Sequence, residues 1–184
     1  KAGADVVSFS GDKLLGGTQC GIIAGKKKLI KKIHSDPLYR ALRCDKFTFS
    51  ILDSVLRTYI DSKNISDKNL TYELLSRGKD ELTEIGNKII LLINKKHIKK
   101  YNIKIEDSYV EAGSGSLPTE KIPSKCIAFN DKKSMKASDI KRSMVSYTTP
   151  IIGFIKKNTF YIDLKAVTED QIATLTAGIN KSLK

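Results

Sequence analysis

The residue best suited to chemistry near the start of the chain is Lys13, in the segment Ser-Gly-Asp-Lys-Leu-Leu-Gly-Gly at 10–17. The segment lies between two apolar runs, 5–10 and 20–25, which predict neighbouring β-strands. An amine at the end of a strand can condense with a cofactor aldehyde if nearby cations or partial desolvation lower its pKa. The glycines would let the backbone approach a ring or a phosphate closely. Spacing alone favours a solvated surface lysine, because most lysines in turns are of that kind.

Two arginines form a second group that could do chemistry. The dipeptide Asp-Pro at 36–37 predicts a helix start, because Asp can cap and Pro fits the first helical position. Arg40 and Arg43 follow three residues apart and are expected on one face near that start. Two guanidinium forks at a positive helix terminus suit a tetrahedral oxyanion, although a solvated or ion-paired face is the alternative. Asp12 either orients the neighbouring lysine, polarises the anion site, or simply caps the turn.

Composition limits the classes of protein to consider. The chain has 184 residues, 40% of them hydrophobic, with no run long enough to span a membrane and no signal peptide. We therefore expect a cytoplasmic protein of one or two domains, and the missing initiator Met indicates a fragment. Cys20, Cys44 and Cys126 form no Cys-x-x-Cys pair, and His34 and His97 are expected on the surface. A metal site is therefore not expected, and isolated thiols fit a reducing compartment.

The charge of the chain is strongly positive. A formal net charge of +13 permits a polyanionic partner such as RNA, through neutralisation of phosphates. Most of the 33 basic residues are lysines scattered along the chain, so solvated lysine faces explain the charge equally well.

Apolar periodicity predicts an α/β chain whose C-terminal part is α+β, with helices on a mainly antiparallel sheet. Helices are expected over 26–33, from 36 into a longer helix with the stripe Phe49, Leu52, Leu56, Tyr59 and Ile60, and over 77–97, 137–145 and 169–183. Strands are expected over 103–112, 125–130, 150–155 and 160–164, the last two as a hairpin, and a capping box at 168–171 precedes the final helix. The polar stretch 61–69 indicates a domain boundary.

The segment 3–27, which contains Lys13, closely resembles the pyridoxal-phosphate segment of bacterial selenocysteine synthases, the L-seryl-tRNA(Sec) selenium transferase family. The resemblance continues at 37–46 and resumes at 113–118, 150–153 and 163–164, in the order of the family. Thr18-Gln19-Cys20 stands where the family usually has Pro-Gln-Ala, and Ser114 where it commonly has glycine. Neither change removes a reactive group.

The resemblance implies a fold-type-I pyridoxal-phosphate enzyme with a large cofactor domain and a smaller C-terminal domain. Residues 1–35 would be the last strands of the large domain, 36–65 connecting helices and 66–184 the small domain. The acid that pairs with the pyridine nitrogen and the groups that bind the cofactor phosphate would precede residue 1. The fragment alone is therefore expected to be inactive and to bind the cofactor weakly.

The resemblance also implies the reaction and its residues. Lys13 would bind pyridoxal 5'-phosphate and act as a base, assisted by Asp12, while seryl-tRNA(Sec) becomes selenocysteinyl-tRNA(Sec) through an aminoacrylyl intermediate. Arg40 and Arg43 match arginines of the selenophosphate site. Family members form homo-oligomers, commonly of ten subunits, with active sites between partners. Ser114 and Ser116 either line a loop near the domain interface or form an ordinary tight turn.

Two other functions remain open. A pyridoxal-phosphate lyase of the same family would act on a small phosphorylated amino acid or an amino-sugar acid, and would share the lysine segment. A non-catalytic RNA-binding or assembly module would account for the charge. Against that module, the aromatic residues mostly fall at core spacing, so no stacking platform for RNA bases is evident.

Overall fold

The computed structural model describes residues 3–61, 63, 65–112, 121–130 and 135–183. The chain divides into two compact units. Unit 1 comprises Lys1–Ser76 with Ala112–Pro118, and unit 2 comprises Arg77–Glu111 with Thr119–Lys184. The boundary that the sequence suggested at 65/66 therefore falls inside unit 1.

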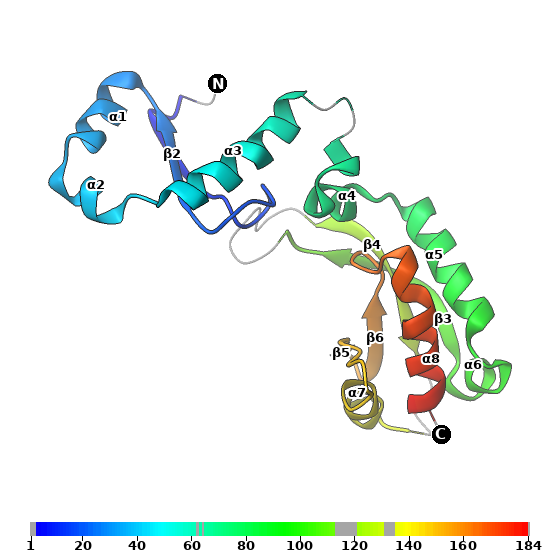
Figure 1. The fold of residues 1–184 in the computed structure, drawn as a ribbon. Helices are drawn as coiled ribbons and strands as arrows, with labels where there is room; N and C mark the ends of the chain where they lie inside the picture. Colours follow the sequence, from blue (N-terminus) through cyan, green and yellow to red (C-terminus); the bar gives the residue numbers. More distant parts are fainter. Residues whose placement is uncertain (1–2, 62, 64, 113–120, 131–134, 184) are drawn as a thin grey trace. The chain divides into compact units, whose positions relative to one another are not determined.

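Unit 1 begins with the expected pair of strands. β1 (Val6–Ser10) and β2 (Gly21–Gly25) are antiparallel, with Ser10 opposite Gly21, so the segment between them returns the chain to the same end of the ribbon. The regular elements of the unit that follow β2 are helices (Figure 1). Its helices are α1 (Lys27–His34), α2 (Pro37–Leu42), α3 (Lys46–Asp61), the 3-10 turn η1 (Ile65–Asp67) and α4 (Leu70–Ser76).

Helix α4 was not expected, because the sequence analysis assigned no element to 70–76, directly after the polar stretch 61–69 that it interpreted as a boundary. Asn69 begins the helix, since its side-chain Oδ1 accepts a hydrogen bond from the backbone N–H of Tyr72 at 3.0 Å. This bond satisfies one of the amides that have no partner within the first turn of a helix.

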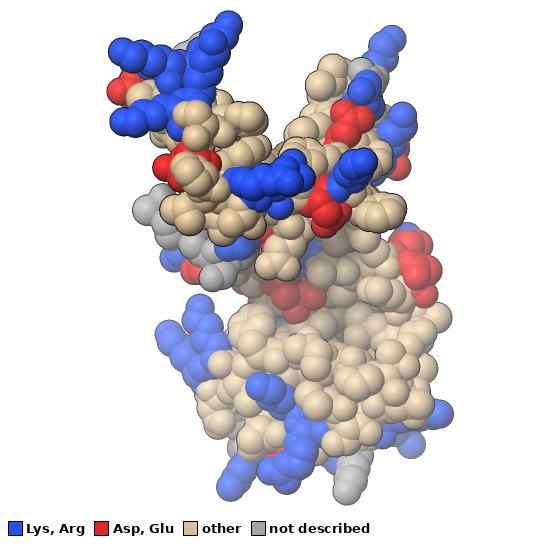
Figure 2. Space-filling view, turned by 60° about the vertical axis from the view of Figure 1, so that its left-hand side comes forward, with Lys and Arg blue, Asp and Glu red and all other residues tan. Residues whose placement is uncertain are grey.

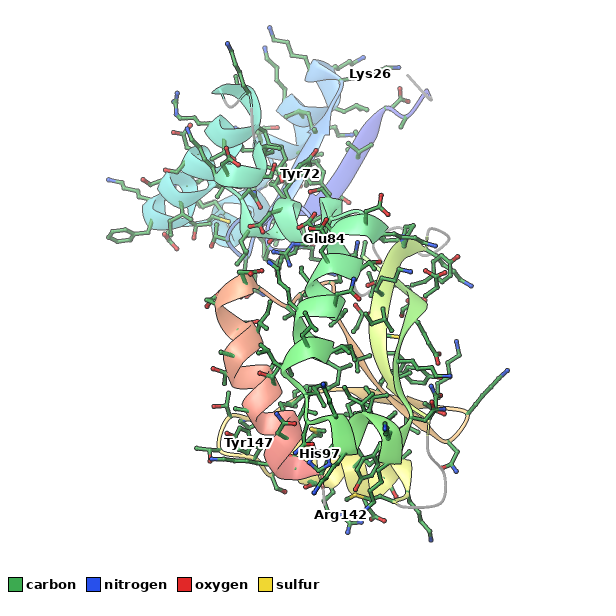
Figure 3. All side chains as sticks on the ribbon, turned by 90° about the vertical axis from the view of Figure 1, so that its right-hand side faces the viewer. Lys26, Tyr72, Glu84, His97, Arg142 and Tyr147 are labelled. Carbon is green, nitrogen blue, oxygen red and sulfur yellow. The ribbon has the colours of Figure 1, made fainter. Side chains whose placement is uncertain are left out.

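Unit 2 is the expected layer of helices on an antiparallel sheet, which confirms the predicted α/β class with an α+β C-terminal part. Its sheet has the order β3-β4-β6-β5, and every neighbouring pair is antiparallel. Helices α5 and α8 lie side by side against the sheet, and side chains fill the space between the layers (Figures 1 and 3). The elements are α5 (Lys79–Leu92), α6 (Lys95–Tyr101), β3 (Ile103–Val110), β4 (Ile122–Phe129), α7 (Ala137–Val145), β5 (Phe154–Lys156), β6 (Thr159–Asp163), η2 (Glu169–Gln171) and α8 (Ile172–Ser182).

The helix predicted over 77–97 is confirmed as α5 but is wrong in its end, because the chain leaves the helical conformation at Ile93 and starts α6 after Asn94. The side chain of Asn180 in α8 stabilises this break. Its Nδ2 donates to the carbonyl of Leu92 at 3.0 Å, and its Oδ1 accepts from the N–H of Asn94 at 2.8 Å. Backbone groups that lose their helical partners are thus satisfied from a segment far away in the sequence.

Two local predictions in unit 2 are confirmed. β5 and β6 form the expected hairpin, whose two turn residues, Lys157 and Asn158, both have positive φ, 48° and 62°. Positive φ at both central positions is typical of the type I′ turn, which matches the twist of a hairpin. The capping box is also present, with Thr168 and Gln171 each bonding the backbone of the other.

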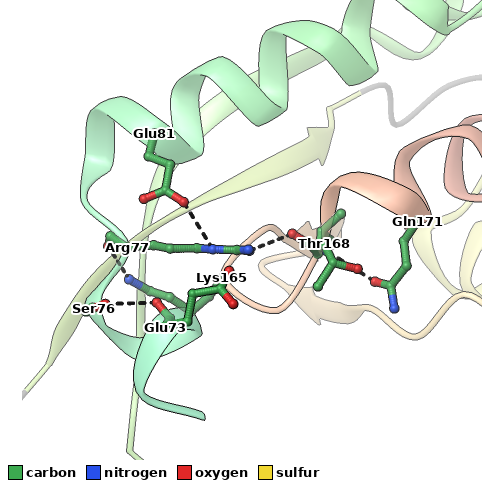
Figure 4. Close-up of polar contacts among 8 residues, drawn as sticks. Glu73, Ser76, Arg77, Glu81, Lys165, Thr168 and Gln171 are labelled. Carbon is green, nitrogen blue, oxygen red and sulfur yellow. Dashed lines mark hydrogen bonds and ion pairs between the residues drawn. The ribbon is translucent and has the colours of Figure 1, made fainter. Parts of the chain in front are cut away.

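A buried polar cluster fastens the start of unit 2 (Figure 4). Arg77 donates from Nη1 to the carbonyl of Val167 at 2.7 Å and pairs through Nε with Glu81 at 3.1 Å. The buried amine of Lys165 donates to the carbonyl of Arg77 at 2.8 Å, and desolvation lowers its pKa. These bonds join the first residue of unit 2 to the segment that precedes α8.

Candidate active site

The loop that carries Lys13 is closed by backbone hydrogen bonds. The N–H of Gly11 donates to the carbonyl of Cys20 at 2.9 Å, and the N–H of Gly17 donates to the carbonyl of Gly11 at 2.8 Å. Within the loop, the N–H of Gly16 donates to the carbonyl of Lys13 at 2.9 Å. Residues 13–16 therefore form a β-turn, and Lys13 is its first residue.

The glycines of this loop serve the loop itself. A Cβ on Gly11 would lie 2.8 Å from the carbonyl oxygen of Thr18, and one on Gly17 would lie 3.0 Å from that of Gly11. Gly16 has a φ of +71°, which side-chain-bearing residues rarely adopt. The sequence suggested that these glycines admit a ligand, but the space beside them is filled by the chain.

Lys13 lines a cavity of about 340 Å³ in unit 1. The lining residues are Phe9, Ser10, Lys13, Leu14, Leu15 and Tyr59. Two aromatic rings and two leucines make most of this wall apolar, and none of the described residues that line it is acidic. Lys13 is exposed, so its amine is accessible from solvent.

Asp12, the neighbour of Lys13, is exposed and is not among the residues that line this cavity. Within the described residues it makes no hydrogen bond or ion pair. The structure therefore gives it neither of the contacts that the sequence suggested, a bond to the lysine or a capping bond in the turn.

The expectation that Arg40 and Arg43 share one face at a helix start is wrong. Asp36 caps α2 as predicted, accepting from the N–H of Leu38 at 2.9 Å, but the helix ends at Leu42. Arg40 lies in its last turn, and Arg43 is extended, with ψ of 141°. The helix stops there because a new one starts at once. The carboxylate of Asp45 accepts from the N–H of Thr48 at 2.9 Å.

Arg43 lines a second cavity of unit 1, of about 270 Å³. Cys20, Cys44 and His34 also line it, whereas Lys13 and Arg40 do not. Among the cavities that the described residues form, Arg43 and Lys13 therefore line different ones. Cys20 and Cys44 are half-buried, and only the third thiol, Cys126, is fully buried among the described cysteines.

A larger cavity of about 550 Å³ lies on the sheet of unit 2. Phe154 and Tyr161 stack in its wall with ring centroids 5.2 Å apart, an aromatic pair that the sequence analysis did not anticipate. The charged lining residues are Glu106, Asp107, Glu111, Lys121, Lys156 and Lys157. Because the described lining holds three acids and three lysines, these residues give the cavity no excess positive charge for a polyanion.

The two histidines and the two serines that the sequence analysis singled out have different outcomes. His34 is exposed as expected, but His97 is half-buried and packs near the ring of Tyr101. Ser114 and Ser116 lie outside the described residues. The described part of the chain contains no cluster of side chains that could hold a metal ion, and none of its helices is long and apolar enough to cross a membrane.

Two residues at the lysine loop were missed from the sequence, Tyr59 and Asn69. Tyr59 fitted the apolar stripe of α3, and Asn69 lay in a stretch interpreted as a loop. Both bond the carbonyl of Leu15, which is 44 and 54 positions away. No local pattern reports contacts over such separations. The only signal was a polar group, the tyrosine hydroxyl, on an otherwise apolar stripe.

Comparison with known proteins places these features in a family. A model of the L-seryl-tRNA selenium transferase family (SelA) matches residues 1–168. The chain is 37% identical over 175 residues to L-seryl-tRNA(Sec) selenium transferase of Desulfotalea psychrophila, covering 95% of this chain and 37% of the relative. It is 38% identical over 168 residues to that of Clostridium perfringens, covering 91% and 36%. The chain thus spans little more than a third of the length of these relatives.

A solved structure has the same fold. The structure of D-glucosaminate-6-phosphate ammonia-lyase superposes with a TM-score of 0.62 at 18% identity, covering 98% of this chain and 44% of that chain. Lys13 and its closed loop lie within the segment that the family model matches. With that match and relatives above one-third identity, the chain belongs to the L-seryl-tRNA selenium transferase family.

Proposed function

We propose that this chain carries the cofactor lysine and the C-terminal part of a pyridoxal-phosphate-dependent transferase that converts seryl-tRNA(Sec) to selenocysteinyl-tRNA(Sec) with selenophosphate. The observation that carries the proposal is the family match over residues 1–168, which includes the closed loop around Lys13. In this proposal, 1–35 end the large cofactor domain, 36–65 connect, and 66–184 form the small domain.

The residues around Lys13 fit an aromatic aldehyde cofactor. The lysine is exposed beside a cavity of about 340 Å³ whose wall includes the rings of Phe9 and Tyr59. Aromatic rings pack well against a flat ring. Among the described residues, the lining includes no acid for the pyridine nitrogen and no cluster of cations for the phosphate. Those contacts would come from other parts of a full-length protein, as the resemblance implies.

Pyridoxal 5'-phosphate, when bound, supplies an electron sink for the carbanion at the α-carbon of the seryl group. Lys13 holds the cofactor through its amine, and that amine is the group placed to move the α-proton. For Asp12, which is next to Lys13 in the chain, we propose that its carboxylate orients this amine or polarises the anion site of the full-length protein.

For selenophosphate, we retain Arg40 and Arg43 as the proposed anion-binding residues. They do not share the cavity of Lys13 in one chain. A homo-oligomer reconciles the two observations, because the arginines of one subunit would then serve the lysine of another. Planar guanidinium groups bind tetrahedral oxyanions through paired hydrogen bonds, which suits them to this ligand. A decamer in the cytoplasm is the assembly that the resemblance implies.

A pyridoxal-phosphate lyase of small amino acids is the second candidate, because the solved structure with the same fold is an ammonia-lyase. Its 18% identity supports the fold, whereas the relatives above one-third identity bear the transferase name. The weight of the comparisons therefore favours the transferase.

The test uses the full-length gene product that contains this chain. It is incubated with seryl-tRNA(Sec), with bulk tRNA charged with serine, and with a phosphorylated amino-sugar acid, each with and without selenophosphate. We expect selenocysteinyl-tRNA only from the first, and loss of product in Lys13→Ala but not in Lys28→Ala, an exposed lysine of α1. Ammonia release from the sugar acid, without any product from the charged tRNA, would overturn the transferase in favour of the lyase.

A further inference from the structure

We propose that Tyr59 and Asn69 are positioning residues for Lys13, which together hold the 13–16 turn and thereby aim the lysine amine into its cavity. That this positions a catalytic amine rests on the proposed function. That the two side chains hold the turn rests only on the geometry of unit 1. Neither residue belongs to a motif that the resemblance identifies.

Tyr59 reaches the turn from the last part of α3. Its hydroxyl donates to the carbonyl of Leu15 at 2.9 Å and lies 3.4 Å from the carbonyl of Leu14. The ring also lines the cavity that Lys13 enters. Desolvation raises the pKa of Tyr59, so the hydroxyl remains a donor at neutral pH. Because its proton is committed to Leu15, the hydroxyl acts by holding the turn.

Asn69 reaches the same turn from the start of α4 and is buried, with 7% of its surface exposed. Its Nδ2 donates to the carbonyl of Leu15 at 3.1 Å and to the hydroxyl of Tyr59 at 3.4 Å. Its Oδ1 accepts from the N–H of Tyr72, which fixes the amide relative to α4. Every polar atom of this side chain is therefore used, and the turn is tied to a helix end.

Gly16, the last residue of the turn, also lies against the side chain of Asn69. A Cβ on Gly16 would stand 2.7 Å from the Oδ1 of Asn69, closer than atoms can approach. The amide can lie against the backbone because position 16 has no side chain. The turn that begins at Lys13 is therefore restricted in two ways. Gly16 lies against the amide of Asn69, and the carbonyl of Leu15 accepts hydrogen bonds from Tyr59 and Asn69.

Such restriction matters for a reactive amine, because small displacements of a catalytic group cost large factors in rate. A carbonyl buried without its donor is also costly, so loss of one partner weakens the hold on Leu15. The two donors share one acceptor and contact each other. Their substitutions are therefore expected to be non-additive.

Two variants distinguish loss of the hydrogen bonds to Leu15 from a general loss of folding. Asn69→Asp keeps the oxygen that caps α4 but removes the amide that donates to Leu15. Tyr59→Phe keeps the ring and removes only the hydroxyl. Tyr72→Phe is the matched control, because it deletes the hydroxyl of an exposed tyrosine in α4 and leaves the backbone N–H that bonds Asn69. That hydroxyl makes no hydrogen bond with the described residues.

The first measurement is amide hydrogen exchange in the full-length protein without added cofactor. We expect exchange at Gly16 and Gly17, whose amides close the loop, to accelerate about tenfold in Asn69→Asp and several-fold in Tyr59→Phe. In both variants, the amides of unit 2 should exchange as in the wild type. In the Tyr72→Phe control, the amides of Gly16 and Gly17 should also exchange as in the wild type. Unchanged exchange at 16 and 17 in both variants overturns the proposal.

The second measurement adds pyridoxal phosphate and follows the pH at which its visible absorbance changes, together with the fraction of Lys13 trapped by borohydride. We expect a shifted titration and slower trapping in both variants but not in the control. If the loop loosens and Lys13 is trapped as in the wild type, the positioning role fails while the proposed function stands. If borohydride labels another lysine in the wild type, the proposed function fails. The exchange data still decide whether Tyr59 and Asn69 hold the 13–16 turn.

Discussion

Units 1 and 2 hold their structures by different means. Every buried apolar side chain among the described residues belongs to unit 2, which contains the whole hydrophobic core. In unit 1 the fully buried residues among those described are Gly11 and Asn69. The core of unit 2 is therefore maintained by packing, whereas the lysine loop of unit 1 is maintained by glycines and hydrogen bonds.

The contrast has a consequence for unit 1. Many of its large apolar side chains are exposed, including Leu42 at 78%, Phe47 at 83% and Ile60 at 80%. Exposed apolar patches of this kind mark surfaces that contact other protein. This supports our proposal that residues 1–35, and the connecting helices that follow them, adjoin other protein in a homo-oligomer of the full-length protein.

The net charge of +13 does not select one surface as an RNA-binding site. Lysines and arginines stand out in several separate groups with acidic side chains between them (Figure 2). On the view shown, the charge is thus dispersed, as expected for solvated lysine faces. A site for tRNA needs evidence beyond charge.

The largest expected effect is a core substitution in unit 2. Phe160 is fully buried and packs against Phe129 with ring centroids 5.5 Å apart. Phe160→Ala should lower the free energy of unfolding of unit 2 by about 3–5 kcal/mol, because it leaves a cavity. Chemical denaturation measures the loss. Phe154→Ala, on an exposed ring of the same sheet, is the control, and equal losses in the two variants would contradict a packed core.

A smaller effect is expected from the thiol of Cys126 in β4. Desolvation, followed by the charges of Asp163 and Glu106, raises its pKa from 9.0 to about 11. A raised pKa in the folded state stabilises the fold fully below pH 9, and the contribution is lost as the pH rises through 11. The free energy of unfolding should therefore fall by up to about 2 kcal/mol over this interval.

Comparison with Cys126→Ala isolates this contribution from that of the lysines and tyrosines, which titrate in the same range. The variant should lose less stability than the wild type between pH 9 and 11. Parallel curves for the two proteins would show that the thiol titrates normally. Below pH 9, Cys20 and Cys44 should also react with iodoacetamide well before Cys126, because they are only half-buried.

The smallest effect concerns the backbone of the lysine loop. Gly16→Ala places a side chain at φ of +71° and against Asn69, so we expect a loss of about 1–2 kcal/mol confined to unit 1. Gly21→Ala is the control, since a Cβ there meets nothing within 4 Å. Hydrogen exchange at residue 17 would report local opening. If both variants leave it unchanged, the loop does not depend on its glycines.

Local patterns were sufficient for the parts of the fold that local physics decides. The β5–β6 hairpin, the capping box at Thr168 and the cap at Asp36 were all predicted, because each depends on residues within a few positions. The break at Ile93 was not predicted, because its stabilising partner is Asn180. Helix α4 was missed because the polar residues before it were taken for a linker.

In the candidate site, too, features that depend on neighbouring residues could be predicted and features that depend on distant residues could not. Lys13 and its glycine loop could be recognised from sequence, as could the family. The arginine pair could not be placed, since Asp45 starts a new helix and leaves Arg43 extended. Tyr59 and Asn69 could not be found, because their bonds to Leu15 depend on tertiary structure.

The most direct test of the account is the identity of the lysine that holds the cofactor. The full-length protein is loaded with pyridoxal phosphate, reduced with borohydride and digested, and the labelled peptide is sequenced. We predict a single label on Lys13, within residues 10–17, and no label in Lys13→Ala. A label on any other lysine, or undiminished labelling of the variant, would contradict the account.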